Sequence, residues 1–255
     1  MNNVIGIVGG VGPYAGIDLA TKIFDQTIAE TDQEHLPVAL LSFSGKIAER
    51  SSFVLGESDI NPGYGISEVI LELEKIGSSV VGIPCNTAHA PKIFNVILDG
   101  LKRKNSKVQI VHMIDEVARF IQEEYPEINQ VGVLSTLGTR ESGIYDDCLA
   151  QNGLNIVPPD EMTLEKIHDA IYSIKAKSNP VDESTRQKLS ESIDFLSAKG
   201  AEAVILGCTE LPLAYDCTDK HLVIIDPAMV LARALIREFD PAKLKMLKVN
   251  QLITQ

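Results

Sequence analysis

Short apolar runs alternate with segments of helical periodicity along the first half of the chain. Strands are predicted at the apolar runs, residues 4–10, 37–43, 79–84 and 108–114. Helices are predicted between them, over residues 14–30, 66–77 and 89–102. Strands that alternate with helices are typical of βαβ units, so the pattern predicts an α/β fold with mainly parallel sheets.

The second half of the chain repeats the first. Residues 189–208 follow the pattern of residues 66–85 at a fixed offset of 123, and residues 131–139 resemble residues 5–13. The identical pairs are Ser67/Ser190, Glu68/Glu191, Ile70/Ile193, Leu73/Leu196, Gly77/Gly200, Val81/Val204 and Cys85/Cys208. Any two βαβ segments look alike to some degree, but identities in register across helix, turn and strand favour a duplication.

The duplication predicts two pseudo-symmetric, Rossmann-like α/β lobes with mainly parallel sheets and an active site in the cleft between them. We expect an N-terminal lobe over residues 1–113 and a C-terminal lobe over residues 114–225. The segment 226–255 is expected to pack back on the first lobe. Residues 175–186 are interpreted as a polar linker between helices, and residues 243–255 as an added surface helix or a frayed end.

Two cysteines occupy equivalent places in the two halves. Cys85 and Cys208 each follow a predicted strand, and ligands collect at the carboxyl ends of parallel strands. A lone cysteine is more often a small buried apolar residue, but a pseudo-two-fold axis would set this pair face to face. One thiolate can remove a proton from a carbon while the opposite thiol returns one, which inverts stereochemistry without a cofactor. Cys148 and Cys217 have no such equivalents and are interpreted as structural.

The net charge and the N-terminal sequence limit the partners and the location that we expect for the protein. With 35 acidic and 23 basic residues, the 255-residue chain carries a net charge of −12. This argues against nucleic-acid or anionic membrane surfaces, which need a positive field. An anionic substrate must therefore be bound by a few local cations. No signal peptide and no apolar run of about 20 residues is apparent, so we expect a cytoplasmic protein with reduced thiols.

One motif suggests a nucleotide site that the rest of the sequence does not support. Gly10, Gly12 and Ala15 fit the GxGxxA fingerprint of dinucleotide-binding folds. The acidic residue expected after the second strand is missing, and Pro13 removes a backbone donor where phosphate would bind. The cysteines and histidines also lack metal-ligand spacing. We therefore expect neither a cofactor nor a metal.

Several segments resemble the aspartate/glutamate racemase family, most closely its PLP-independent aspartate racemases. They are IGIVGGVGP, DQEH, ERSSFVLG, PCNTAHA, STLGT, IYSIKA, GCTEL and IIDP, spread from residue 5 to about residue 237. The resemblance implies interconversion of L- and D-aspartate, or of a similar acidic amino acid such as glutamate, through a Cα carbanion. It also implies a homodimer.

The resemblance assigns roles to particular residues. Cys85 and Cys208 match the family's two catalytic cysteines, and Asn86 and Thr87 match positions that hold the α-carboxylate. Arg50 and Lys175 match basic positions that recognise substrate carboxylates. Further substrate-binding positions predicted in the same motifs are Val11, Gly12, Thr136, Thr139 and Thr209.

Some roles stay open at this stage. His89 either tunes the Cys85 thiol or is a hydrogen-bonded structural histidine, and Glu210 either orients or deprotonates a neighbour or caps a helix. Val11 replaces the family's usual methionine, Lys177 its usual glycine, and residues 42–49 its Asn-Pro-rich loop. These changes adjoin the side-chain end of the site and leave substrate identity open.

Two rival functions use the same two-lobed design. One is another two-cysteine reaction, of the maleate isomerase or hydantoin racemase type. The other is a non-catalytic binding protein for an acidic amino acid.

Overall fold

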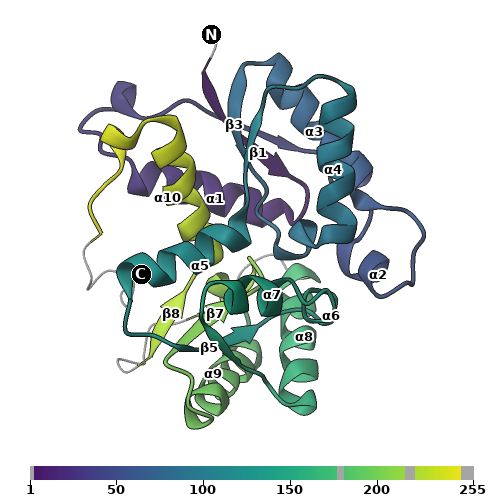
Figure 1. Ribbon diagram of the computed structural model, residues 1–255, viewed down its shortest axis with the longest axis vertical. Helices are drawn as coiled ribbons and strands as arrows, with labels where there is room; N and C mark the ends of the chain where they lie inside the picture. Colours follow the sequence, from purple (N-terminus) through teal and green to yellow (C-terminus); the bar gives the residue numbers. More distant parts are fainter. Residues whose placement is uncertain (1–2, 177–180, 216–221, 248–255) are drawn as a thin grey trace.

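The fold consists of two α/β lobes, each built on a four-stranded parallel sheet (Figure 1). The computed structural model describes residues 3–176, 181–215 and 222–247. The N-terminal sheet contains β1 (Val4–Gly9), β2 (Val38–Ser42), β3 (Ser78–Gly82) and β4 (Gln109–Val111). The C-terminal sheet contains β5 (Gln130–Leu134), β6 (Asn155–Val157), β7 (Ala203–Leu206) and β8 (Val223–Ile225). The predicted fold class is confirmed.

The two sheets have equivalent strand orders, β2-β1-β3-β4 and β6-β5-β7-β8. Strands β3 and β7, which carry the sequence repeat, therefore hold the same place in their sheets. The preceding helices, α3 (Pro62–Lys75) and α9 (Glu183–Ala198), end in the same way. Gly77 and Gly200 follow them with φ of 103° and 93°, a left-handed conformation that glycine adopts without a side-chain clash.

Helices cover both faces of each sheet. In the N-terminal lobe, α3 and α4 (Pro91–Arg103) share one core cluster, and α1 (Pro13–Gln26) and α10 (Pro227–Phe239) belong to a second. In the C-terminal lobe, α8 (Glu161–Ala176) and α9 form a third cluster. The opposite side of that lobe holds α5 (Met113–Glu124) and α7 (Ile144–Gln151), and α5 crosses between the lobes (Figure 1).

One apolar core cluster runs through both lobes. It joins Ile5 and Ile7 of β1 to Val131 and Val133 of β5 through the buried sides of α5 and α10. Helix α10 contacts α1 and β3, so the end of the chain returns to the N-terminal sheet. Helix α10 lies so close to β3 that a Cβ on Gly82 would be 2.7 Å from Leu235 Cδ1. The apolar side chains of α10 thus form part of the N-terminal core.

The remaining elements are short and lie in the loops. The short α-helices are α2 (Arg50–Val54) and α6 (Leu137–Glu141). The 3₁₀ helices are η1 (Asp32–Glu34), η2 (Ser44–Lys46), η3 (Asn86–His89), η4 (Leu211–Leu213) and η5 (Pro241–Lys243). Among the described residues, no helix is both long enough and apolar enough to cross a membrane.

Three segments differ from their sequence predictions. The strand expected over residues 108–114 ends at Val111, and α5 begins at Met113 with His112 at its N-cap. The expected linker 175–186 begins and ends in helix, because Lys175 belongs to α8 and Arg186 belongs to α9.

The described part of the C-terminal tail is extended beyond η5. Leu244 forms an antiparallel bridge with Thr27 beside the end of α1. The expectation of an added helix or a frayed end is therefore wrong for residues 244–247. Residues 248–255 lie outside the described part of the chain, as do Cys217 and Lys177.

Candidate active site

The ends of β3 and β7 bring Cys85 and Cys208 to the wall of one small cavity between the lobes. Each cysteine is 8% exposed. The cavity has a volume of about 10 Å³, enough for about one water molecule. Among the other predicted residues, those that line it are Val11, Arg50, Asn86, Thr87, Lys175, Thr209 and Glu210. Sequence positions far apart therefore converge on the two thiols.

Charged side chains, rather than helix N-termini, define the surroundings of both thiols. Cys85 precedes the four-residue helix η3, and α4 begins only at Pro91. Cys208 is followed by the three-residue helix η4. Neither cysteine is therefore followed directly by a helix of more than four residues.

Glu210 is the immediate partner of Cys208. The Cys208 Sγ donates a hydrogen bond of 2.9 Å to Glu210 Oε2. Burial, followed by the negative charge of Glu210, raises the pKa of Cys208 well above its usual value. Glu210 makes no side-chain capping bond to η4, so capping is not its role. Gly12 leaves room for this carboxylate, since a Cβ there would lie 2.6 Å from Glu210 Oε1.

Arg50 lies beside Cys85 in the first turn of α2. Its guanidinium donates to the carbonyl oxygens of Val11 at 2.9 Å and Ala48 at 3.3 Å. Burial alone would lower the pKa of Arg50, but Cys85 and Glu49 outweigh burial and raise it. The Nε of Arg50 is buried and has no hydrogen-bond partner among the described residues. The arginine therefore keeps an unused donor at the site.

Lys175 approaches the thiols from the last turn of α8. Its Nζ lies 4.9 Å from the centre of the Tyr172 ring, a cation–π distance. Burial would lower the pKa of Lys175, but the negative forms of Cys208 and Glu210, with Cys85, outweigh burial and raise it. Lys175 is therefore a charged ammonium within the field of both thiols.

Asn86 presents a second unused donor. Its Oδ1 accepts a hydrogen bond of 2.6 Å from the hydroxyl of Tyr145, which fixes the orientation of the amide. Its Nδ2 is buried without a partner among the described residues. Tyr145 lies on α7 in the other lobe, 59 residues along the chain, and no sequence motif marked it. The hydroxyl of a buried tyrosine usually forms a hydrogen bond, and this general tendency is the one signal that could have marked Tyr145.

Four hydroxyls form a chain that begins and ends at the cavity wall and links the lobes. Ser51 Oγ lies 3.3 Å from Thr136 Oγ1, which lies 3.1 Å from Thr139 Oγ1. Thr139 Oγ1 in turn lies 2.7 Å from Thr87 Oγ1. Thr136 and Thr139 were expected at the substrate, and they sit in this chain rather than among the cavity's lining residues. Their contact with substrate stays a prediction.

Two further predicted residues also lie close to the thiols. Thr209 Oγ1 donates to the carbonyl oxygen of Pro84 at 3.2 Å, which joins the two cysteine loops. Gly12 lines a wider groove beside the cavity, and Glu49, Arg50, Lys175 and Glu210 line both. The groove is thus continuous with the cavity.

His89 supports the backbone of Cys85 rather than its thiol. Its Nδ1 lies 2.9 Å from the Cys85 carbonyl oxygen, to which it can donate. Burial, with the neighbouring His112, lowers the pKa of His89 to about 3, so the ring is neutral at physiological pH. Of the two roles considered for His89, the structure favours the hydrogen-bonded structural one.

Cys148 lies apart from the cavity. Burial, with Asp115, raises the pKa of its thiol to about 12. Its Sγ lies 3.6 Å from the carbonyl oxygen of Ile114. This surrounding fits a structural role. Within the described residues, no three histidine, cysteine or acidic side chains gather in a way that could hold a metal.

The fold and the site thus consist of two parallel-sheet lobes with a paired-cysteine cavity between them. The chain belongs to the Asp/Glu/Hydantoin racemase family, whose sequence model matches residues 8–235. It is similar to the Picrophilus torridus aspartate racemase, at 28% identity with a TM-score of 0.81 over 100% of both chains. It is 24% identical to the broad specificity amino-acid racemase RacX of Bacillus subtilis, over 92% of this chain and 98% of RacX.

The same fold extends to an enzyme of different chemistry. The maleate isomerase Iso of Pseudomonas putida S16 superposes with a TM-score of 0.53 at 12% identity. The match covers 94% of this chain and 93% of that one. At this identity the likeness concerns the fold alone.

Proposed function

We propose that the protein is a PLP-independent racemase that interconverts L- and D-aspartate, with glutamate as a second substrate. The observation that carries the proposal is the pair Cys85 and Cys208 on the wall of one buried cavity. Family membership supports racemisation, and the similarity to an aspartate racemase supports the acidic substrate.

The two thiols divide the proton transfer between them. The cysteine that is a thiolate removes the Cα proton and becomes a thiol, leaving the electron pair on the carbanion. The opposite cysteine gives its proton to the other face of that carbon and becomes a thiolate. Cys208 needs an acceptor for its proton before it can act as the base, and Glu210 Oε2 at 2.9 Å supplies one.

Unused donors in the cavity suit a carboxylate. Arg50 Nε and Asn86 Nδ2 are buried and have no partner in the described part of the chain, and an unpaired buried donor costs about 1–3 kcal/mol. A bound carboxylate would satisfy both, and the ammonium of Lys175 adds a second positive charge. A carboxylate held in this way also lowers the energy of the developing carbanion.

The cavity must widen to admit substrate. A volume of about 10 Å³ holds a water molecule but not an amino acid. The polar links that close it here are hydroxyl contacts such as Thr87–Thr139 and Thr209–Pro84. Such neutral hydrogen bonds contribute about 0.5–1.5 kcal/mol each, so replacing them with hydrogen bonds to water costs little free energy. We therefore propose that the lobes part to bind and release substrate.

The proposal is tested by incubating each aspartate enantiomer with the protein in D₂O. We expect deuterium at Cα together with loss of optical rotation. Cys85→Ser and Cys208→Ser should each lower racemisation by at least about 10²-fold, since a positioned proton-transfer group contributes 10²–10⁴-fold. Cys148→Ser, which alters a cysteine outside the cavity, is the matched control and should retain activity.

Two results would contradict the proposal. One is folded protein that binds aspartate without exchanging its Cα proton, which would indicate a binding protein. The other is near-normal turnover in both cysteine variants, which would exclude a two-thiol mechanism. A parallel assay with maleate, read as fumarate formation, separates the racemase from an isomerase of carbon–carbon double bonds.

A further inference from the structure

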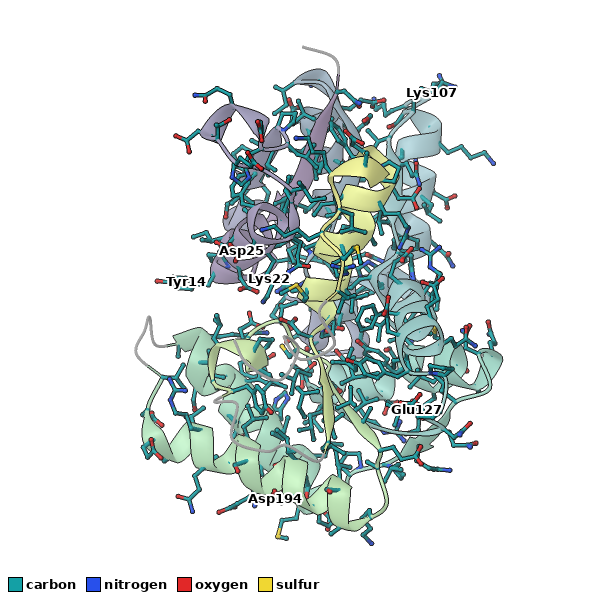
Figure 2. The ribbon with its side chains drawn as sticks, turned by 90° about the vertical axis from the view of Figure 1, so that its left-hand side faces the viewer. Tyr14, Lys22, Asp25, Lys107, Glu127 and Asp194 are labelled. Carbon is teal, nitrogen blue, oxygen red and sulfur yellow. The ribbon has the colours of Figure 1, made fainter. Side chains whose placement is uncertain are left out.

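A groove of about 640 Å³ opens beside the cysteine cavity and shares four residues with it. Its outer walls come from both lobes and are largely apolar or aromatic. They include Tyr14, Ile17, Ile47, Tyr172, Val181 and Leu213. Figure 2 shows Tyr14 reaching outward from the start of α1, at the level where the two lobes meet. The groove therefore leads from the thiols to solvent along an apolar surface.

The charges of the groove are concentrated at its inner end and balance there. Among the described residues that line it, the cations are Arg50 and Lys175, and Glu49 and Glu210 lie with them. These four also line the cavity, and their formal charges cancel. The remaining acidic residue, Asp18, already pairs with Lys22. Beyond the inner end, the described walls offer no cation to a second carboxylate.

The size of the groove exceeds what aspartate requires. A volume of 640 Å³ lies within the 300–1,000 Å³ typical of sites for ligands much larger than a four-carbon amino acid. Its mouth exposes large apolar side chains, with Tyr14 at 47% and Ile17 at 54%. Exposed apolar side chains that line a groove can supply the apolar contacts of a ligand-binding site.

We infer that the groove receives the side chain of the substrate and that neutral amino acids with extended apolar side chains are racemised as well. This inference rests on the proposed two-cysteine function. In the proposed complex, the Cα atom lies between the thiols and the α-carboxylate binds the unused donors. A side chain longer than that of aspartate would then extend into the groove. Methionine, leucine and phenylalanine represent this class, and alanine is the reference because its methyl group ends before the groove.

The test measures Cα-proton exchange and racemisation for aspartate, alanine, methionine, leucine and phenylalanine. We expect a higher kcat/KM for methionine and phenylalanine than for alanine. Ile17→Asp places a charge on the apolar wall and should lower the methionine-to-alanine ratio of kcat/KM about tenfold, the lower end of what apolar pocket contacts contribute. Ile28→Asp is the matched control, since Ile28 is 46% exposed and lies outside the groove.

Each outcome bears on a different part of the argument. Exchange of aspartate without exchange of any long apolar amino acid would overturn the inference and leave the proposed function intact. A methionine-to-alanine ratio that Ile17→Asp does not change, or that Ile28→Asp lowers equally, would also overturn it. No exchange with any amino acid by correctly folded protein would refute the proposed function itself.

Discussion

At the scale of single residues, the two thiols differ in their nearest charged partner. Cys85 lies beside the guanidinium of Arg50, and Cys208 donates to the carboxylate of Glu210. The negative charge of Glu210 favours the thiol form of Cys208 and, with burial, raises its pKa. Equivalent positions in the two lobes therefore have different neighbours. In the proposed mechanism, this difference in neighbours distinguishes the two cysteines as proton donor and acceptor.

Glu210→Gln tests this asymmetry. The charge of Glu210 raises the pKa of Cys208, so its removal should lower that pKa and move the Cys208-dependent limb of the pH–rate profile to lower pH. The plateau rate should fall on the order of 10²-fold, because the proton acceptor is lost. Kinetics across pH, with peptide-resolved alkylation of Cys208, measure both effects. Glu141→Gln, an exposed carboxylate on α6, is the control, and an unchanged pH profile in Glu210→Gln would contradict the assignment.

The sequence marked residues of the cavity where a local motif exists, and it missed a residue whose contact is long-range. Cys85 and Asn86 share one loop with Thr87, and a short motif marks all three. Tyr145 belongs to no motif, because its role arises from a hydrogen bond to Asn86 across the lobe boundary. The pairing of Glu210 with Cys208 was one of two open alternatives, since the direction of a side chain after a turn depends on tertiary packing.

At the scale of elements, the repeat is visible as matched helix ends. Gly200 has φ of 93°, and a Cβ placed there would meet no atom within 4 Å. Gly200→Ala should therefore cost only the backbone penalty of the left-handed conformation, about 1–2 kcal/mol. Gly45 offers the same open space without a positive φ, so Gly45→Ala should be neutral or slightly stabilising. Urea unfolding of both variants measures the difference, and equal stabilities would contradict the argument.

The strand predicted over residues 108–114 shows where element prediction reaches its limit. Met113 and Ile114 are fully buried, as a buried strand would have them, but they begin α5. A short apolar run fits a buried strand or a buried helical turn equally well. Asp115 and Glu116 in the first turn of α5 are the signal that separates the two. Alternation and duplication, which depend on longer stretches, predicted two lobes with mainly parallel sheets, but they did not mark the short edge strand β6.

At the scale of the whole molecule, the shared core predicts cooperative unfolding. Ile5 and Ile7 of one sheet and Val131 and Val133 of the other belong to one buried cluster. Separate domains usually unfold in separate steps, but lobes with a common core should unfold together. Pulse-labelled hydrogen exchange of the β3 and β7 peptides across a urea series should give one midpoint. Midpoints that differ beyond experimental error would show that the lobes are independent.

The return of α10 to the N-terminal sheet affects the order in which the nascent chain can fold. The pocket that receives Leu231 and Leu235 against Gly82 exists once β3 has been synthesised, but those leucines come more than a hundred residues later. At 5–20 residues per second, the ribosome needs on the order of ten seconds to deliver them. During that interval the N-terminal lobe carries an open apolar face, while the chain of the C-terminal lobe emerges beside it. The first lobe to be made therefore lacks part of its apolar core until α10 has been synthesised.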